Sequence, residues 1–269
     1  MILRHAREPV DGQPVENTFV AVDERSGAAL GSCTIYIQEN EVLFPNRPLR
    51  IYLEISGEPV PDALLGASVA RAMEIGLQSR RSCRVFTQVD PDDSERMAAL
   101  SALGFRDNDG LVCMQRELPT RFEVELPYGC VVVRDTLDDP IEQKFFLERY
   151  NQLYNEGFDF EWLQEFRSKP GFGRILLVGS AGMVCECVIW QEGRSGVIGW
   201  IQTSKKWRRR GIAQAMLYLA CEDFEGRGLQ AVQSEIQARI PYVLKCFERS
   251  GFTQSELIAR YPGIDIDPQ

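Results

Sequence analysis

The sequence predicts an α/β (α+β) fold of two tandem domains, each a mixed central β-sheet flanked by helices. Segments with strand-like and helix-like periodicity alternate along the chain, and the same order occurs twice. A stretch with two prolines, residues 117–129, separates the two copies. The 269 residues, 44% of them hydrophobic, are enough for two cores. We therefore expect one domain at residues 1–119 and a second at 120–269.

The strands of the first domain are indicated by short apolar runs. They cover residues 19–24, 33–38, 49–55, 84–89 and 111–118.

Two helices are expected between these strands. The first starts at Asp62 and carries one apolar face, formed by Leu65, Val69, Met73 and Leu77. The second starts with the capping-box pair Asp92 and Glu95, and a Gly-Phe pair at 104–105 ends it. Its apolar positions are Met97, Leu100 and Leu103.

The second half repeats this order. Strands are expected at residues 174–180, 183–190, 197–204, 230–237 and 255–261, and helices at 138–154, 160–168, 211–224 and 241–250. Gly66 and Gly211 open corresponding helices, and a second Gly-Phe pair lies at 251–252. The constant spacing predicts an internal duplication. The first copy is truncated, because it lacks the helices that precede the strands of the second.

The charge balance limits the partners. The net charge of −9 predicts no broad contact with nucleic acid or an anionic membrane, since both would be repelled by most of the surface. The N-terminal residues carry charges and no apolar core of a secretory signal. The longest apolar stretch, 175–190, is interrupted by Gly, Ser and Glu and predicts two strands. We expect a cytoplasmic protein.

Eight cysteines without a CxxC pair, and a single histidine, His5, are typical of reduced, buried thiols. A Cys/His zinc site is not expected, and no metal is predicted. Cys185 and Cys187 share one face of a strand and could bind a soft metal, but no further soft ligand is near in sequence. Buried strand residues are the preferred interpretation.

The segment from Lys205 to Arg210 places five cations in six positions. A basic run can be a solvated face or a nucleic-acid patch. Here it stands directly before Gly211 and a helical pattern, so a local anion site at a helix N-terminus is the third possibility.

With a strand, a cation-rich loop, Gly-x-Ala, a long helix, a strand, a short helix and Gly-Phe in this order, the C-terminal half resembles the GNAT N-acetyltransferase superfamily. Residues 208–213 match its acyl-CoA motif, Arg/Gln-x-x-Gly-x-Gly/Ala, and residues 246–252 match its helix ending in Gly-Phe. The resemblance implies an N-acyltransferase that moves an acetyl or other acyl group from acetyl-CoA or another acyl-CoA to a small-molecule or peptide amine. The amine attacks directly in a ternary complex.

The resemblance places the coenzyme A diphosphate at the start of the helix, where unpaired N–H groups and a positive partial charge favour an anion. The strand before the loop would bind the pantetheine arm through its backbone, and one of its N–H groups would stabilise the oxyanion. The expected coenzyme-binding residues are Ile201, Gln202, Thr203, Arg208, Arg209, Arg210, Gly211, Ile212, Ala213 and Gln214. Lys205 and Lys206 can equally be solvated.

The catalytic residues depart from the family's pattern. Family members often have Tyr as the acid four residues before the Gly of Gly-Phe, where this chain has Phe247, which we expect in the core. Tyr242 is the nearest hydroxyl on that helix and a candidate acid. The strand before the loop has no carboxylate, so Glu235 and Glu186 are candidate bases. Proton removal through a chain of waters stays open.

The first copy has Pro59 and Pro61 in its loop, together with Glu58 and Asp62, whose negative charge would repel a phosphate. We expect a degenerate copy. A non-catalytic acyl-CoA sensor or interaction module is the alternative function. The acceptor and a possible homodimer are left open. Aromatic residues before and in the helix at 160–168 suggest either an apolar acceptor wall or ordinary helix packing: Phe158, Phe160 and Trp162.

Overall fold

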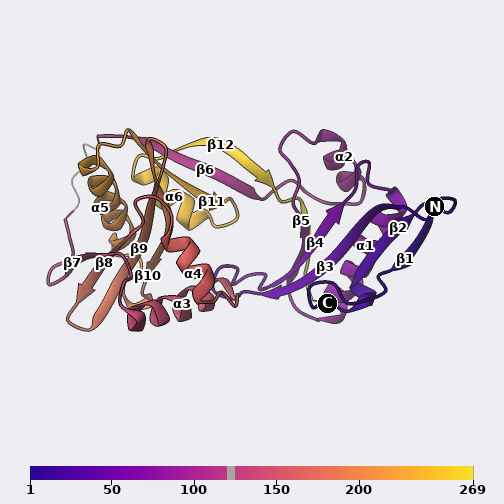
Figure 1. Cartoon of the computed structure of the whole chain (residues 1–269), viewed down its shortest axis with the longest axis horizontal. Coiled ribbons are helices and arrows are strands. Elements are labelled where there is room, and N and C mark those ends of the chain that lie inside the picture. The colour runs from indigo at the N-terminus through magenta and orange to yellow at the C-terminus, as the bar shows by residue number, and fades with distance from the viewer. Residues whose placement is uncertain (120–124, 269) are drawn as a thin grey trace. The chain divides into compact units, whose positions relative to one another are not determined.

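The computed structural model of the chain describes residues 1–119 and 125–268. These form two compact units. Unit 1 contains Met1–Leu111, Leu153–Asn155 and the chain from Ile258 onward, and unit 2 contains Val112–Gln152 and Glu156–Leu257. Figure 1 shows one sheet with flanking helices in each unit.

Unit 1 is built on a six-stranded sheet in the order β1-β2-β3-β4-β5-β13. Its strands are β1 (Ile2–His5), β2 (Thr18–Val22), β3 (Ala29–Glu39), β4 (Leu49–Ser56), β5 (Cys83–Thr87) and β13 (Gly263–Ile266). Its helices are the 3-10 turn η1 (Val15–Asn17), α1 (Asp62–Gln78) and α2 (Ser94–Ala102). Neither α-helix precedes the first strands, which agrees with the expected truncation of this copy.

Unit 2 is built on a seven-stranded sheet in the order β12-β6-β11-β10-β9-β8-β7. Its strands are β6 (Gly110–Glu117), β7 (Val131–Asp135), β8 (Gly173–Gly179), β9 (Gly182–Glu192), β10 (Ser195–Thr203), β11 (Ala231–Gln237) and β12 (Thr253–Arg260). Its helices are α3 (Pro140–Tyr154), α4 (Phe160–Arg167), the 3-10 turn η2 (Lys205–Trp207), α5 (Ile212–Gly226) and α6 (Pro241–Arg249).

The two halves of the sequence exchange strands. The strand expected to complete the first domain forms as β6, but it lies between β12 and β11 in the other sheet. In return, β13 from the C-terminus pairs antiparallel with β5, with Gly263 opposite Phe86. Each exchange covers a strand edge that would otherwise expose unpaired backbone groups. The compact units therefore do not follow a single cut at 119/120, and residues 120–124 of the predicted boundary lie outside the described residues.

Several local predictions need correction. Gly66 lies inside α1 rather than at its start, because α1 begins at Asp62, while Gly211 is the N-cap of α5. The second helix is capped by Asp93, whose carboxylate accepts from the N–H of Arg96, and not by Asp92. Leu77, next to the last residue of α1, is 52% exposed, and Leu103, the C-cap of α2, is 39% exposed.

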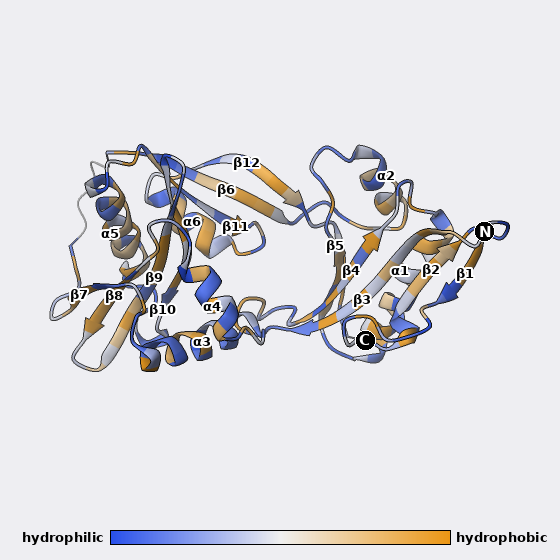
Figure 2. Cartoon of the chain, viewed as in Figure 1, coloured by the Kyte–Doolittle hydropathy of each residue, from blue (hydrophilic) through white to orange (hydrophobic). Residues whose placement is uncertain are grey.

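The core of unit 2 lies between the sheet and α5. Buried α5 residues, among them Met216, Ala220 and Phe224, pack on the side chains of β9 and β10. Figure 2 shows hydrophobic residues along β8 of this sheet and mixed colours on α3 and α4. Within the described residues, none of the helices is long and apolar enough to cross a membrane.

Candidate active site

Strands β10 and β11 separate soon after they start. Their parallel pairing covers only Ser195 to Val197, opposite Ala231 to Gln233, although β10 continues to Thr203 and β11 to Gln237. Beyond Val197, the Ser234 hydroxyl still donates to the carbonyl of Ile198 at 2.7 Å. The β11-facing backbone of the second half of β10 is therefore available to an extended ligand, as an added strand would use it.

A bulge at Gly199 reverses which face the β10 side chains use. Ile198 pairs with Ile189 of β9, whereas Trp200 already pairs with Val188, so Gly199 is the extra residue. Gly199 has no Cβ, and the ring of Trp190 occupies the place where a Cβ would be. After the bulge, Ile201 packs on the core beside α5, while Trp200 and Gln202 turn to the opposite face.

The loop between β10 and α5 is held in an unusual conformation. The N–H of Ser204 donates to Val184, and the Arg208 guanidinium donates through Nε to the carbonyl of Thr203 at 3.1 Å. Arg209 and Gly211 both have positive φ, 63° and 76°. A non-glycine residue in this region costs about 1–3 kcal/mol and is found mostly where function requires it. Alternation of this kind turns backbone N–H groups toward one concave surface that suits an anion.

The cations of this loop lack counter-ions within the described part of the chain. Among the described residues, no carboxylate forms an ion pair with Lys205, Lys206, Arg208, Arg209 or Arg210. Arg210 lies over the Trp207 ring, 5.4 Å from its centroid. Gly211 caps α5 without a side-chain hydrogen bond, so the first N–H groups of α5 have no intrahelical acceptor. Positive charge and free donors converge in a chain that is acidic as a whole.

The helix after the next strand brings Tyr242 near this loop. Partial burial raises the pKa of Tyr242, and the charge of Arg208 acts against that rise, so the two side chains lie within electrostatic range. Tyr242 is 60% exposed on the first turn of α6. Phe247 is buried in the core with its ring against Phe252, which confirms the core interpretation.

The two candidate bases have different surroundings. Glu235 is exposed on β11, and the alternation of that strand places it on the face used by Trp200 and Gln202. Glu186 is wholly buried. Both of its oxygens are bound to Arg149, at 2.8 and 3.0 Å, and Arg174 approaches at 3.2 Å. Glu186 is thus a structural anion that fixes α3 on the sheet, and its bonds to two arginines leave it unsuited to act as a base.

The cysteines of β9 lie in the core. Cys185 and Cys187 are fully buried on the α5 side of the strand, as the pattern predicted. Burial raises the pKa of Cys185 to about 12 and that of Cys187 well above its usual value, so both thiols stay protonated and poorly nucleophilic. No cluster of potential metal ligands occurs among the described residues.

Aromatic rings cover the face opposite α5. Trp200 contacts Phe146 and Tyr150 of α3, with ring centroids 5.3 and 5.4 Å apart. Phe158 stacks on Trp162 at 4.4 Å, and Trp162 lies 4.9 Å from Tyr150. Phe160 is exposed. Sequence periodicity did not predict that the Trp200 side chain lies on this face, because periodicity assumes a strand without a bulge. The signal available in the sequence was Gly199, since a glycine inside an apolar strand often marks a bulge.

The corresponding strands of unit 1 do not open. β4 and β5 pair over Leu49 to Leu53 opposite Cys83 to Thr87, the full length of β5, and β3 pairs with β4 without a bulge. The helix that follows, α1, begins with Asp62 after Pro61 and has no cation in its first turn.

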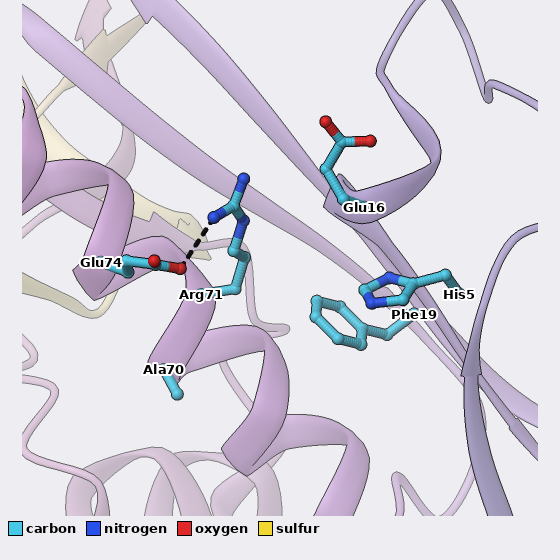
Figure 3. Close-up of a pocket in the computed structure, with 6 residues that line it drawn as sticks. All are labelled: His5, Glu16, Phe19, Ala70, Arg71 and Glu74. Carbon is cyan, nitrogen blue, oxygen red and sulfur yellow. Dashed lines mark hydrogen bonds and ion pairs between the residues drawn. The ribbon is translucent and has the colours of Figure 1, made fainter.

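An open hollow of about 720 Å³ lies elsewhere in unit 1, between α1 and the first strands (Figure 3). His5 lies against Phe19, with ring centroids 4.6 Å apart. Arg71 also lines the hollow and pairs with Glu74 at 2.7 Å. Glu16 adds a further carboxyl group to the lining, which makes the hollow a poor place for a phosphate.

Comparison with known proteins agrees with this geometry. Residues 140–252 match the acetyltransferase (GNAT) family. No curated protein sequence matches the chain significantly. Among solved structures, a GCN5-related N-acetyltransferase from Sphaerobacter thermophilus is 17% identical with a TM-score of 0.51, covering 96% of this chain and 83% of that one. A tandem GNAT protein from the clavulanic acid biosynthesis pathway is 15% identical, with a TM-score of 0.46 and coverage of 94% and 82%.

The likeness to the Sphaerobacter thermophilus protein extends over both units and concerns the fold, since the identity is low. The family match falls on the segment that contains the open strands and the cationic loop. The predicted fold and acetyltransferase class are thereby confirmed. Residues 140–252 match the GNAT acetyltransferase family, and the chain as a whole has the fold of two tandem GNAT-like domains.

Proposed function

We propose that unit 2 transfers an acetyl group, or another acyl group, from acyl-CoA to an amine that attacks the thioester directly in a ternary complex. The observation that carries the proposal is the set of cations on a strained loop at the N-terminus of α5, none of which has an ion-pair partner in the described ranges 1–119 and 125–268. A diphosphate would accept the free N–H groups and neutralise the arginines. The residues present therefore fit coenzyme A.

In this proposal, Arg208, Arg209 and Arg210 hold the phosphates, and the backbone from Gly211 to Gln214 supplies N–H donors. The backbone of Ile201, Gln202 and Thr203 holds the pantetheine arm in the gap between β10 and β11. Bound acetyl-CoA supplies the acyl group as a thioester. A backbone N–H of β10 near the bulge stabilises the developing oxyanion.

Two side chains are proposed to move protons. Glu235 is exposed on the proposed acceptor face and would take a proton from the ammonium, directly or through water. Tyr242 lies near Arg208 and would donate a proton to the departing thiolate. A carboxylate and a phenol in these positions each typically contribute about 10²-fold or more to the rate. Glu235→Gln and Tyr242→Phe should lower kcat by such a factor and leave the affinity for acetyl-CoA within threefold.

Unit 1 is proposed to be a degenerate copy without a coenzyme site. Its strands stay paired where those of unit 2 open, and its loop carries Glu58 and Asp62 in place of arginines. We propose that the truncated copy corresponds to residues 1–119 of the sequence and the catalytic copy to residues 120–269, although each copy contributes a strand to the other sheet. One molecule of acetyl-CoA per chain is the expected stoichiometry.

Isothermal titration with acetyl-CoA tests the coenzyme site. The wild-type chain is compared with an Arg208→Glu, Arg210→Glu double variant. The matched control is Arg4→Glu, Arg7→Glu, which makes the same charge change at exposed positions of unit 1. Two lost charged hydrogen bonds of about 1.5 kcal/mol each predict binding roughly 100-fold weaker for the loop variant. The control should stay within threefold.

Turnover is then followed as release of free thiol from acetyl-CoA in the presence of primary amines. Absence of acetyl-CoA binding by the wild type would refute the coenzyme site. Tight binding without turnover of any amine would refute the transferase and leave an acyl-CoA-binding module.

A further inference from the structure

Two buried polar atoms on β10 have no hydrogen-bond partner. The indole Nε1 of Trp200 and the amide Oε1 of Gln202 are both inaccessible to solvent and unbonded among the described residues. Trp200 is only 4% exposed. Buried polar groups in folded proteins are almost always satisfied, so two such groups on one strand require an explanation.

The two atoms belong to one face of the sheet. Trp200 and Gln202 are two residues apart and follow the Gly199 bulge, so both side chains leave β10 on the side of α3. Their Cα atoms are about 6.6 Å apart along an extended strand. One group is a donor and the other an acceptor. A molecule that carries both an acceptor and a donor could therefore satisfy the two groups together.

The cross-strand neighbours do not take these roles. Across the strand, Trp200 faces Val188 and Gln202 faces Glu186. The Glu186 oxygens are already bound by Arg149 and Arg174. Around Trp200 lie the rings of Phe146 and Tyr150, at 5.3 and 5.4 Å.

This strand is also where the proposed function places the reacting groups. Glu235, the proposed base, lies on the same face of the neighbouring β11. A molecule bound to Trp200 and Gln202 would therefore be the acceptor. Half-buried rings of Tyr150, Phe158 and Trp162 line the same side and can cover an apolar body.

We propose that Trp200 and Gln202 select an acceptor amine that carries a carbonyl or hydroxyl oxygen on a carbon near the nitrogen, as in an α-amino amide. Gln202 Oε1 accepts a hydrogen from the amine nitrogen, and Trp200 Nε1 donates to the oxygen. The inference rests on the proposed acyltransferase function and names its substrate class. A plain alkylamine satisfies only one of the two buried groups, and sites of this kind discriminate strongly against a substrate that leaves a polar group unpaired.

The test compares phenylalaninamide with 2-phenylethylamine, which have the same ring and differ in the carboxamide. The quantity measured is the ratio of their kcat/KM values, and comparing this ratio between variants cancels the different basicities of the two amines. In Trp200→Phe, the ratio should fall at least tenfold. Gln202→Leu should lower kcat/KM for both amines by a similar factor, and Gln202→Glu, which keeps an acceptor oxygen, should restore part of it.

Trp190→Phe is the matched control, because its indole belongs to the same aromatic cluster but donates to Glu192 at 2.7 Å. It should keep the wild-type ratio. The unfolding midpoint gives a readout without turnover: Trp200→Phe loses no hydrogen bond and should be less destabilised than Trp190→Phe.

The outcomes separate the two proposals. If the wild type acetylates both amines and Trp200→Phe keeps the wild-type ratio, the recognition of an oxygen by Trp200 is wrong while the transferase stands. If the wild type acetylates no amine, the proposed function itself is wrong and the inference falls with it. If Trp200→Phe lowers the unfolding midpoint more than Trp190→Phe does, the claim that the Trp200 indole has no hydrogen-bond partner is contradicted.

Discussion

Replacing Gly199 by Ala tests how the bulge of β10 shapes the active site. An added Cβ would lie 1.8 and 2.2 Å from two ring carbons of Trp190, far inside van der Waals contact. The Trp190 ring has little freedom to move. It packs against Phe166 at 5.5 Å, Lys169 lies 3.9 Å from its centroid, and its Nε1 donates to Glu192.

The expected cost follows from these contacts. Overpacking of a filled site typically costs about 1–3 kcal/mol. Displacing the ring also strains the hydrogen bond to a carboxylate, which contributes about 1.5–3 kcal/mol when intact and less where it is partly exposed. We expect Gly199→Ala to lower the free energy of unfolding by about 3 kcal/mol. Because the bulge also turns Trp200 and Gln202 to the proposed acceptor face, kcat/KM should fall at least tenfold.

Urea unfolding and steady-state kinetics on the same protein measure both effects. Gly226→Ala is the control, since it lies near the end of α5, has no atom within 4 Å of an added Cβ and does not have a positive φ. It should be neutral or stabilised by about 0.4–1 kcal/mol. A Gly199→Ala variant with the stability of the control and unchanged kinetics would refute both the contact with Trp190 and the role of the bulge.

Three further predictions concern the loop, the buried ion pairs and the thiols. Gly211→Ala, at φ 76° with open space around it, should cost about 1–2 kcal/mol of stability by denaturant unfolding and weaken acetyl-CoA binding by titration; unchanged values would show that the loop does not need this conformation. Glu186→Gln leaves Arg149 and Arg174 without their shared carboxylate and should lower the free energy of unfolding, measured in urea, by about 3 kcal/mol. The control Glu148→Gln, at an exposed position beside Arg149 on α3, should change it by less than about 0.5 kcal/mol. Equal effects of the two substitutions would contradict the buried network. Burial raises the pKa of Cys33 to about 11 and those of Cys185 and Cys221 to about 12, from an ordinary 9.0. As the pH rises, these thiols therefore ionise first in the unfolded chain. Their contribution to stability is complete below pH 9, and above it the free energy of unfolding should decrease by about 1.4 kcal/mol per thiol and pH unit. Urea unfolding at pH 8 and pH 10 measures this loss, which Cys185→Ala should reduce.

The sequence alone determined the features that depend on neighbouring residues. The order of strands and helices, the start of α5 after Gly211 and the concentration of cations from Lys205 to Arg210 follow from periodicity, helix-end chemistry and local charge. Phe247 could be assigned to the core for the same reason, since its spacing along α6 places it with other apolar residues. These are local properties, and each was readable without knowing what packs against the segment.

Only the tertiary structure decided how distant segments pair. Nothing in β6 states that it will lie beside β11 in unit 2, because an apolar strand fits any open edge of matching length. The Gly199 bulge depends on the register of β10 against β9, and that register moved Trp200 to the face covered by α3. Glu186 looked like a candidate base until Arg149, 37 residues away, proved to bind both of its oxygens. Backbone conformation is largely set by adjacent residues, whereas register, burial and ion pairing are set by partners that the chain brings together only on folding.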